Sequence, residues 1–573
     1  MTLAPEIRTA TGKRWRLRGR FPDGALDGAP YQPLIRHLLW HRGVRTVAQA
    51  VAFTDAADPR HDVTLLPDIN AALARLGRAI KEGELIAVYG DFDVDGVTAS
   101  AILLEGLAEL GAKVMPYIPD RFTEGYGVNT RAIESLHGAG AAVMITADCG
   151  TSSVVEIGAA LALGVDTIVL DHHTVPPELP PAVAIVNPKR TDSEYPEPEL
   201  SSGGLAIRLI EALYDRLGRS FDAGRYLDLV ALSTVCDMAP LRGENRWLVR
   251  EGLRALAKTQ RPGLRALMET AGCDPARADA STIGFVIGPR LNAAGRLDHA
   301  RKALELLMEK DEGRAREMAL NLATLNQQRQ AATSAACELA RELVSADDPD
   351  AALIFVGHRD IPSGIVGLVA ARLLEDHYKP AVVYEEGETN SRASCRSIPE
   401  FDITAALRTV PELMERFGGH RAAAGFTAQN ANLPALKAAL QARAAEELAG
   451  VDLVSALEVD AAVPLGRING EFIRSLAALA PFGMGNPEPV FLSRGLEVRD
   501  IRVMGGDGQH LRLALKDGRV TWPAVAFGVR TEEGTIPGDL QVGGRIDAVY
   551  TFSTDRGSDG AMELRLLDFA PSD

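Results

Sequence analysis

The chain has 573 residues, of which 46% are hydrophobic and 24% charged, and its formal net charge at pH 7 is −16. This length is too great for one hydrophobic core and predicts about three or four domains, and the ordinary globular composition excludes a disordered or low-complexity protein. The acidic balance argues against a protein that coats nucleic acid non-specifically, because that function needs an excess of Lys and Arg.

No apolar run in the sequence reaches the roughly 18 residues that a membrane span needs, and residues 1–20 lack the apolar core of a signal peptide. The cysteines form no C-x-x-C pair, which argues against a zinc site or a disulfide framework. They are Cys149, Cys236, Cys273, Cys337 and Cys395. We therefore expect a cytoplasmic protein without membrane contact.

The first feature along the chain is a basic cluster, KRWRLRGR at residues 13–20, within an N-terminal region of residues 1–55. Such a cluster forms either a solvated arm or a source of positive charge beside an acidic site. The sequence alone leaves both interpretations open.

Short apolar runs alternate with helical stretches over residues 84–188, within a predicted catalytic domain of residues 56–300. The runs lie at 86–89, 114–118, 143–147, 167–170 and 183–186, a pattern typical of a parallel α/β sheet. Most of them end in a polar cluster, and ligands of open α/β sheets bind beyond the carboxyl ends of the strands. We therefore expect these clusters to converge on one crevice.

The first cluster, DFDVDG at residues 91–96, places three alternate carboxylates after an apolar strand: Asp91, Asp93 and Asp95. A calcium EF-hand loop begins in the same way but needs a Glu at its twelfth position, which here is Ile102. A solvated acidic turn is the other interpretation, but Val, Ala and Ile surround these residues. The pattern therefore favours a metal site at a strand end.

Further carboxylates and imidazoles follow later apolar runs: Asp148, Asp171, His172, His173 and Asp237. Each alone is more often structural, since an Asp at a strand end commonly caps the next helix. Together they predict an oxygen-rich site with one or two imidazoles, which suits Mn²⁺ or Mg²⁺ better than Zn²⁺. Two such ions can hydrolyse a phosphate ester.

Residues 314–344 contain no Gly or Pro and predict one long helix, or a bent pair, within a connecting segment of residues 301–346. A smaller α/β domain is expected over 347–450, with strands near 353–356 and 381–384 and a helix near 365–378. Residues 490–569 are rich in strand and turn signals, so a small β-barrel resembling an OB-fold is expected within 451–573.

Several motifs in order resemble the DHH and DHHA1 signatures of RecJ exonucleases: GDFDVDG at 90–96, DCG at 148–150, DHH at 171–173, Asp237, and FGGHRAAAG at 417–425. Two more, GPRLNAAGR at 288–296 and PFGMGNPEP at 481–489, resemble segments of RecJ in particular. The resemblance covers most of the chain. It implies a two-metal exonuclease that degrades single-stranded DNA from 5′ to 3′ into 5′ mononucleotides, in DNA repair and recombination.

The resemblance also implies roles for the metal-site residues. Asp93 and Asp148 would bind one ion, and Asp148 would bridge to a second ion held also by Asp95, His172 and Asp237. His173 would face the scissile phosphate, and Asp171 would orient the two imidazoles. Many DHH phosphoesterases have a ligand His where this chain has Tyr89, so Asp91 is expected to replace it, directly or through a water.

The resemblance assigns DNA contacts to a second set of residues. Arg121, Ser394 and Arg396 would hold the 5′ phosphate, and Gly419 and His420, expected in a tight turn, would contact the backbone. Arg290, Asn292 and Arg296 are candidate strand contacts, although each could instead form an interdomain salt bridge. No Walker A motif is present, so we expect a separate RecQ-type helicase and a single-stranded-DNA-binding protein as partners of a monomer.

Three alternative functions share part of this motif set. A DHH phosphodiesterase of short oligonucleotides or cyclic dinucleotides would not need the long N-terminal region or the β-rich C-terminal region, and a family II inorganic pyrophosphatase lacks the Gly-Gly-His signature. A non-catalytic DHH scaffold in a replication complex would be expected to lose its ligand residues. The intact ligand set therefore favours an enzyme.

Overall fold

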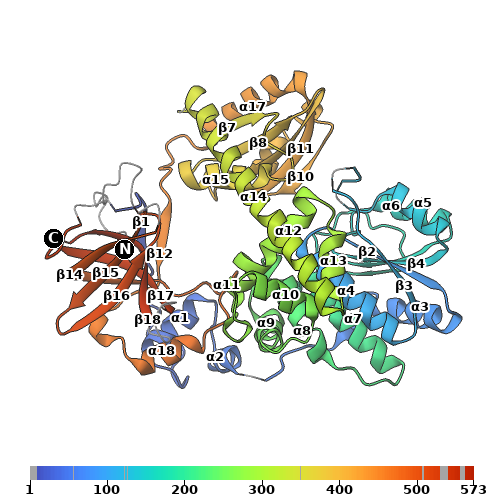
Figure 1. Cartoon of the computed structure of the whole chain (residues 1–573), viewed down its shortest axis with the longest axis horizontal. Helices are drawn as coiled ribbons and strands as arrows, with labels where there is room; N and C mark the ends of the chain where they lie inside the picture. Colours follow the sequence, from blue (N-terminus) through green and yellow to red (C-terminus); the bar gives the residue numbers. More distant parts are fainter. Residues whose placement is uncertain are drawn as a thin grey trace. The chain divides into compact units, whose positions relative to one another are not determined.

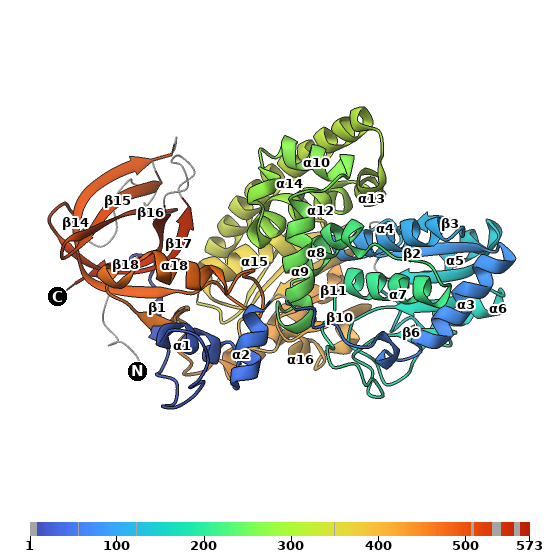
Figure 2. The ribbon, with the colours of Figure 1, turned by 90° about the horizontal axis from the view of Figure 1, so that it is seen from below.

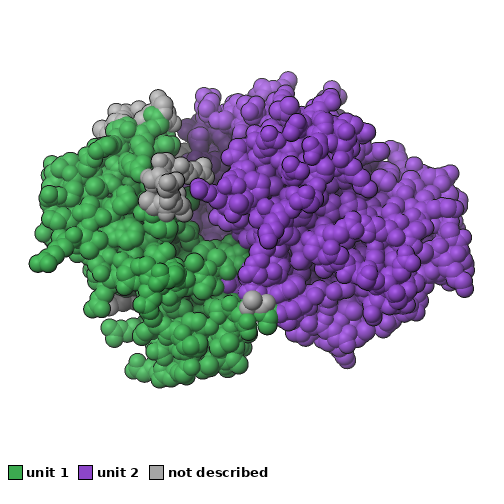
Figure 3. Space-filling model, turned by 60° about the horizontal axis from the view of Figure 1, so that its bottom comes forward, with its two compact units in different colours: residues 1–57, 452–482, 486–573 green, residues 58–451, 483–485 purple. Residues whose placement is uncertain are grey.

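The computed structural model divides the chain into two compact units (Figure 3). Unit 1 comprises residues 1–57, 452–482 and 486–573, and unit 2 comprises residues 58–451 and 483–485. The structure describes residues 9–55, 57–121, 123–125, 127–348, 350–505, 509–529, 540–554 and 562–572. Among these residues, no helix is both long and apolar enough to cross a membrane.

Unit 2 begins with the expected parallel sheet (Figures 1 and 2). Its strand order is β3-β2-β4-β5-β6, with bounds β2 Leu85–Gly90, β3 Lys113–Tyr117, β4 Ala141–Ala147, β5 Asp166–Leu170 and β6 Ala184–Val186. Helices cover both faces, as near-continuous apolar strands require. They are α3 Ile69–Glu82, α4 Val94–Glu109, α5 Thr130–Gly138, α6 Val154–Ala162 and α7 Ser202–Arg216. The predicted sheet is thus confirmed.

A helical layer follows the sheet, and it ends in one long helix. Its members are α8 Leu227–Cys236, α9 Gly243–Leu256, α10 Pro262–Thr270, α11 Ala280–Thr282, a π-helix at Ile283–Ile287, α12 Gly288–Leu297, α13 Arg301–Met308 and α14 Glu312–Ala346. The expected segment 301–346 is two helices, because Asp311 caps a new helix by accepting the N–H of Arg314. Helix α14 is continuous over 35 residues, so the bent pair is wrong.

The second sheet of unit 2 has the order β10-β11-β9-β8-β7. Its strands are β7 Ile354–His358, β8 Ala381–Glu386, β9 Asn390–Arg396, β10 Arg416–His420 and β11 Ala423–Gln429, with helices α15 Val366–His377, α16 Ile403–Leu407 and α17 Leu433–Glu447. The tight turn expected at Gly419 and His420 is wrong. Both lie in strand β10, where Gly419 pairs with Ala424 and has a φ of 145°. A Cβ at this position would lie 2.4 Å from the Ala423 carbonyl oxygen, so there is no room for a side chain.

Unit 1 contains the expected barrel. Strands β14 Phe491–Met504, β15 His510–Asp517, β16 Val520–Ala526, β18 Met562–Pro571 and β17 Arg545–Thr554 follow one another, and a β14–β17 pairing closes the ring. A short strand β13 Ala461–Ala462 pairs in parallel with the start of β14. Helices α1 Pro33–His41, α2 Val47–Thr54 and α18 Gly470–Ala477 complete the unit, and its core includes residues from both α1 and the barrel strands.

The basic cluster near the N-terminus is part of this unit. Strand β1 Arg14–Leu17 pairs in parallel with strand β12 Ala456–Val459, and the buried Trp15 donates its indole N–H to Asp568 at 2.8 Å. Its arginines form a ladder of ion pairs with acidic residues: Arg14 with Asp452, Arg16 with Glu458 and Arg18 with Asp460. The solvated arm is therefore wrong, and the cluster's charge is partly neutralised within its own unit.

Candidate metal centre

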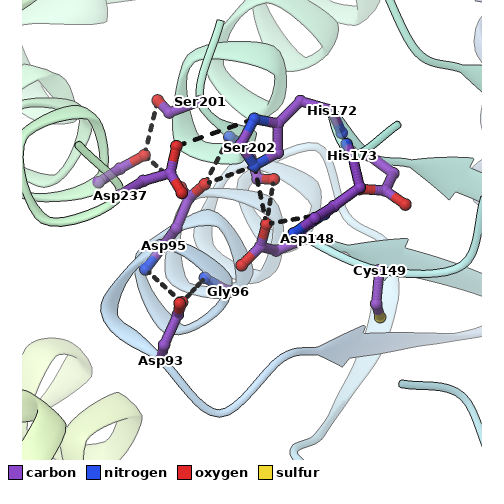
Figure 4. Close-up of polar contacts among 12 residues, drawn as sticks. Asp93, Asp95, Gly96, Asp148, Cys149, His172, His173, Ser201, Ser202 and Asp237 are labelled. Atoms are coloured by element: carbon purple, nitrogen blue, oxygen red, sulfur yellow. Dashed lines mark hydrogen bonds and ion pairs between the residues drawn. The ribbon is translucent and has the colours of Figure 1, made fainter. Parts of the chain in front are cut away.

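The DFDVDG motif turns strand β2 into helix α4. Asp93 is the N-cap of α4, and its Oδ1 accepts the backbone N–H groups of Asp95 at 2.9 Å and Gly96 at 3.2 Å. Asp95 lies in the first helical turn, so both carboxylates are presented at the carboxyl end of the strand (Figure 4). Asp93 therefore caps helix α4, and this capping holds the backbone of the DFDVDG turn in place.

Asp95 is the most constrained carboxylate of the site and is only 1% exposed. It accepts the backbone N–H of Ser202 at 2.9 Å, the N–H of Gly203 at 3.0 Å and the hydroxyl of Ser233. A Cβ on Gly203 would lie 2.4 Å from the Ser233 hydroxyl oxygen, so this close approach requires Gly. The start of helix α7 thus holds Asp95, a contact that the sequence did not reveal.

Asp148 directly follows strand β4 and has the left-handed conformation, with a φ of 69°. Its Oδ1 accepts the Ser202 hydroxyl at 3.0 Å and lies 3.1 Å from His172 Nε2. That nitrogen is 3.5 Å from Asp95 Oδ2, and His172 Nδ1 is 3.8 Å from Asp237 Oδ2. The structure therefore brings Asp95, Asp148, His172 and Asp237 together, with Asp237 supplied by the C-terminal end of helix α8 (Figure 4).

Asp171 follows strand β5 and contacts the imidazole of His173 and the backbone of His172, so only His173 has its ring held directly by Asp171. Its Oδ1 accepts the His172 N–H at 2.7 Å and lies 2.8 Å from His173 Nδ1, and its Oδ2 accepts the Thr151 N–H at 3.0 Å. Burial works against the charge of Asp171, but the hydrogen bonds from His173 and Thr151 lower its pKa below the usual range. Burial likewise opposes charge on His173, yet Asp171 raises the pKa of His173 to about 9.

The carboxylates and imidazoles form three groups whose ligand atoms lie within 4.8 Å of one another. These groups are Asp91 with Asp93 and Asp148, Asp95 with His172 and Asp237, and Asp148 with His172 and His173. Asp148 belongs to two of the groups, and His172 is also shared. Such an arrangement can hold two adjacent ions with common ligands.

Electrostatics supports a cation at this position. Burial, followed by the charges of neighbouring carboxylates, raises the pKa of Asp93 and raises that of Asp91 and Asp148 strongly. The same causes raise the pKa of Asp237 to about 8. Asp91 Oδ1 is also buried without a hydrogen-bond partner among the described residues. Bound cations would relieve both the repulsion and the unsatisfied oxygen.

Tyr89 takes no part in this cluster. Its ring stacks on Tyr117 with centroids 5.2 Å apart, and its hydroxyl donates to the Gly127 carbonyl at 2.9 Å. The residue is fully buried in a small core beneath helix α5. Tyr89, which occupies the position of a ligand His in many DHH phosphoesterases, therefore has a structural role in this chain. Asp91 instead lies close to Asp93 and Asp148.

A cleft of about 970 Å³ opens beside the carboxylates, between the carboxyl edge of the first sheet and strands of the second. His173, Ser394, Gly419 and His420 line it. It is also lined by five arginines: Arg121, Arg296, Arg392, Arg396 and Arg416. The structure thus gathers most of the predicted substrate-binding residues around one positively charged space.

Arg296 is half-buried among other guanidinium groups at this cleft. Burial, and then the charges of Arg121, Arg329 and Arg396, lowers the pKa of Arg296 to about 10. Arg329, from helix α14, was not singled out by the sequence, because a polar residue in a long helix carries no signal. Arg396 donates to the Ser394 hydroxyl at 3.3 Å. Crowded guanidinium groups are suited to a phosphate, which accepts several of their hydrogen bonds.

Two predicted contacts lie outside the cleft lining. Arg290 donates through Nη1 to the Val286 carbonyl at 2.7 Å, and Asn292, two residues further along helix α12, is half-buried. Among the described residues that line the cleft, Arg296 is the only one from helix α12. The sequence motif that groups the three residues therefore does not place them at one spot.

A second hollow of about 430 Å³ borders the carboxylates on another side. It shares His173 and His420 with the arginine-lined cleft and adds Lys189 and Met238. Nearby, the buried Asn187 donates to the His173 carbonyl and to the Thr151 hydroxyl, each at 3.0 Å. The sequence did not identify Asn187 or Lys189, since both follow the short strand β6 without a recognisable motif.

Comparison with protein families finds three matching domains in this order. Residues 85–234 match the N-terminal domain of the DHH family, residues 350–446 match the DHHA1 domain, and residues 459–562 match the RecJ OB domain. The first matched segment contains the DFDVDG and DHH motifs, the second contains the Gly-Gly-His strand, and the third contains the barrel strands β14 to β17.

Relatives of known name extend the match beyond single domains. The chain is 36% identical over 510 residues to the single-stranded-DNA-specific exonuclease RecJ of Bacillus subtilis, covering 88% of this chain but only 64% of that protein. It is 38% identical to RecJ of Thermus thermophilus, covering 84% of this chain and 68% of that protein. A crystal structure of Thermus thermophilus RecJ with Mn²⁺ superposes with a TM-score of 0.83 at 32% identity, covering 98% of this chain and 80% of that one.

Proposed function

The chain belongs to the RecJ family of single-stranded-DNA-specific exonucleases, and from this premise we propose that it hydrolyses single-stranded DNA from the 5′ end into 5′ mononucleotides. One observation carries the proposal: a carboxylate and imidazole cluster adjoins a cleft lined by five arginines, and His173 and His420 lie at the junction. Phosphodiester cleavage needs both parts, one to act on the scissile phosphate and one to position the strand.

The residues fit two Mn²⁺ or Mg²⁺ ions. Asp93 and Asp148, aided by Asp91, would hold one ion, and Asp95, Asp148, His172 and Asp237 would hold the other. The unsatisfied Asp91 oxygen and the raised pKa values of the carboxylates support this donor set. When bound, such a pair lowers the pKa of a water and neutralises charge on the attacked phosphate.

The chain's own groups orient the substrate. Asp171 Oδ1 lies 2.8 Å from His173 Nδ1 and raises the pKa of His173, and a protonated His173 would donate a hydrogen bond from Nε2 to a phosphate oxygen at the junction of the two hollows. Asn187 holds the backbone of His173 by donating a hydrogen bond to its carbonyl oxygen. Arg121, Arg396 and Ser394 would hold the 5′ phosphate, and strand β10 would present Gly419 and His420 to the next phosphate.

This arrangement explains a 5′ polarity. A terminal phosphate carries more negative charge than an internal one and would fill the cluster of arginines around Arg296. Cleavage then falls at a fixed distance from that end.

A cleft of about 970 Å³ holds a few nucleotides of single strand, so duplex would have to be opened by a RecQ-type helicase and kept open by a single-stranded-DNA-binding protein. We place this activity in the cytoplasm, in DNA repair and recombination, and expect a monomer.

Degradation of end-labelled oligonucleotides tests the proposal. With Mn²⁺, a 5′-labelled single strand should release its label at once as a mononucleotide, a 3′-labelled strand should shorten gradually, and a blunt duplex should be spared. EDTA and Asp148→Asn should abolish cleavage. Asn tolerates the left-handed backbone at position 148, so this variant should keep the fold. Cleavage confined to dinucleotides would instead indicate a short-oligonucleotide phosphodiesterase, and tight metal-independent binding without cleavage would indicate a scaffold.

A further inference from the structure

Arg121 differs from three other arginines of the cleft in how its side chain is held. Arg296, Arg396 and Arg416 each donate a hydrogen bond to a neighbouring oxygen. Within the described part of the chain, the guanidinium of Arg121 has no such partner, and it lies over the Phe92 ring, 4.9 Å from the centroid. Its direction therefore depends on that ring and on its own backbone.

A single helical turn at residues 120–124 fixes the backbone of Arg121. The Glu124 N–H donates to the Asp120 carbonyl at 2.8 Å, and Glu124 Oε2 accepts the Asp120 N–H at 2.7 Å. Asp120 Oδ1 in turn accepts the Thr123 N–H at 2.8 Å, as the capping residue of a helix would. Both backbone groups of Asp120, the residue directly before Arg121, are thus bonded to Glu124.

The second carboxylate oxygen of Glu124 ties this turn to the sheet and to helix α5. Glu124 Oε1 accepts the Tyr117 hydroxyl at 2.6 Å, at the end of strand β3, and the Asn129 side-chain amide at 3.2 Å. Asn129 caps helix α5 by accepting the Ala132 N–H at 2.8 Å. Burial, followed by the bond to Glu124, raises the pKa of Tyr117, so its hydroxyl remains a donor. One carboxylate therefore joins three segments.

We propose that Glu124 is a positioning residue for the 5′ end of the strand. It fixes the turn so that Arg121 meets a terminal phosphate, and it thereby sets the preference for a 5′ phosphate over a 5′ hydroxyl. The inference rests on the proposed function, which assigns Arg121 to that phosphate. A guanidinium binds phosphate strongly only when its N–H groups are aimed at the oxygens, so a small shift of the turn weakens this contact.

The surroundings of Glu124 favour an indirect role. Arg121, Gly125 and Gly127 line the cleft, whereas Glu124 is not among the described residues that do so. Three donors already occupy its two oxygens. Its bonds also run to β3 and α5, and none of the printed bonds reaches a candidate metal ligand. Loss of Glu124 should therefore weaken binding of the 5′ phosphate and leave the carboxylate cluster intact.

Short single strands with either a 5′ phosphate or a 5′ hydroxyl test this role, with the full chain and Mn²⁺. Glu124→Ala should raise the KM of the phosphorylated strand about tenfold and leave the KM of the hydroxyl strand and both kcat values unchanged. Glu124→Gln can still accept the Asp120 N–H and can donate to the Tyr117 oxygen, so it should keep most of the preference. Tyr117→Phe removes one bond to Glu124 and should raise the same KM about threefold.

Controls separate this inference from the proposed function. Arg121→Ala should lose the same preference, and adding Glu124→Ala to it should cause no further loss. Glu134→Ala removes an exposed carboxylate from helix α5 and should change nothing. Fluorescence anisotropy of both strands in EDTA measures the preference even if nothing is cleaved. The inference would be overturned by a wild type that binds both strands equally, by an equal loss on both strands in Glu124→Ala and Tyr117→Phe, or by a further loss in the double variant.

Discussion

Replacing Asp237 with Asn should make the metal-free protein more stable while removing part of its response to Mn²⁺. Burial, and the charges of Asp95 and Asp93, raise the pKa of Asp237 from 3.8 to about 8 in the folded protein. A carboxyl with a higher pKa in the folded state binds its proton more tightly there than in the unfolded chain. The folded state therefore loses stability as the pH rises from about 4 to about 8.

The size of this effect follows from the pKa shift. At about 1.4 kcal/mol per unit, Asp237 would cost the metal-free fold about 3 kcal/mol at pH 6 and about 5 kcal/mol at pH 8. Asn has the same shape and no proton to lose, so Asp237→Asn removes the penalty. Its advantage over the wild type should grow by about 2 kcal/mol between pH 6 and pH 8.

Differential scanning calorimetry in EDTA at both pH values measures this difference. We expect Asp237→Asn to melt above the wild type, with a gap that widens by about 2–8 °C from pH 6 to pH 8. Mn²⁺ should raise the wild-type midpoint more at pH 8 than at pH 6, and should raise that of Asp237→Asn much less. Asp215→Asn, an exposed change on helix α7, is the matched control. A metal-free Asp237→Asn that melts below the wild type at pH 8 would refute the reasoning.

Three further outcomes are expected. Asn187→Ala should lower kcat about 10–100-fold without changing the Mn²⁺ affinity measured by calorimetry, because it frees the His173 backbone; an unchanged kcat would contradict this. Arg329→Met should raise the KM for 5′-phosphorylated strands and reduce the salt slope of log KM by about 0.7; a slope equal to that of the wild type would show that Arg329 contacts no phosphate. Trp15→Phe should destabilise unit 1 by about 1–3 kcal/mol in urea unfolding, because Asp568 loses a buried donor. In a protein that already carries Asp568→Asn, adding Trp15→Phe should cause no further loss of stability; a further loss would contradict this explanation.

The sequence predicted the parts of the fold that depend on local pattern. The five strands of the first sheet and helix α14 follow from apolar runs and from an uninterrupted stretch of helix-forming residues. The carboxylates of the candidate metal centre were also predictable, because strand ends of a parallel sheet meet at one edge. Asp91, Asp93 and Asp148 lie together for that reason.

What the sequence missed depends on pairing between distant segments. The donors to Asp95 come from Ser202 and Ser233, more than a hundred residues away, and serines at helix ends are too common to stand out. The ion pair of Arg14 with Asp452 joins residues 438 positions apart. Gly419 was assigned to a turn because glycine favours turns, whereas here it permits close contact between two strands.

Unit 1 is built from both ends of the chain, and this has a consequence for synthesis on the ribosome. Strand β1 cannot pair until strand β12 emerges, after nearly four hundred residues of unit 2 have been made. At about 5–20 residues per second, the N-terminal segment would wait roughly 20–80 s with Trp15 and the apolar face of α1 uncovered. Nascent chains of this protein should therefore depend on a holding chaperone over that interval, even while the sheets of unit 2 are already folding.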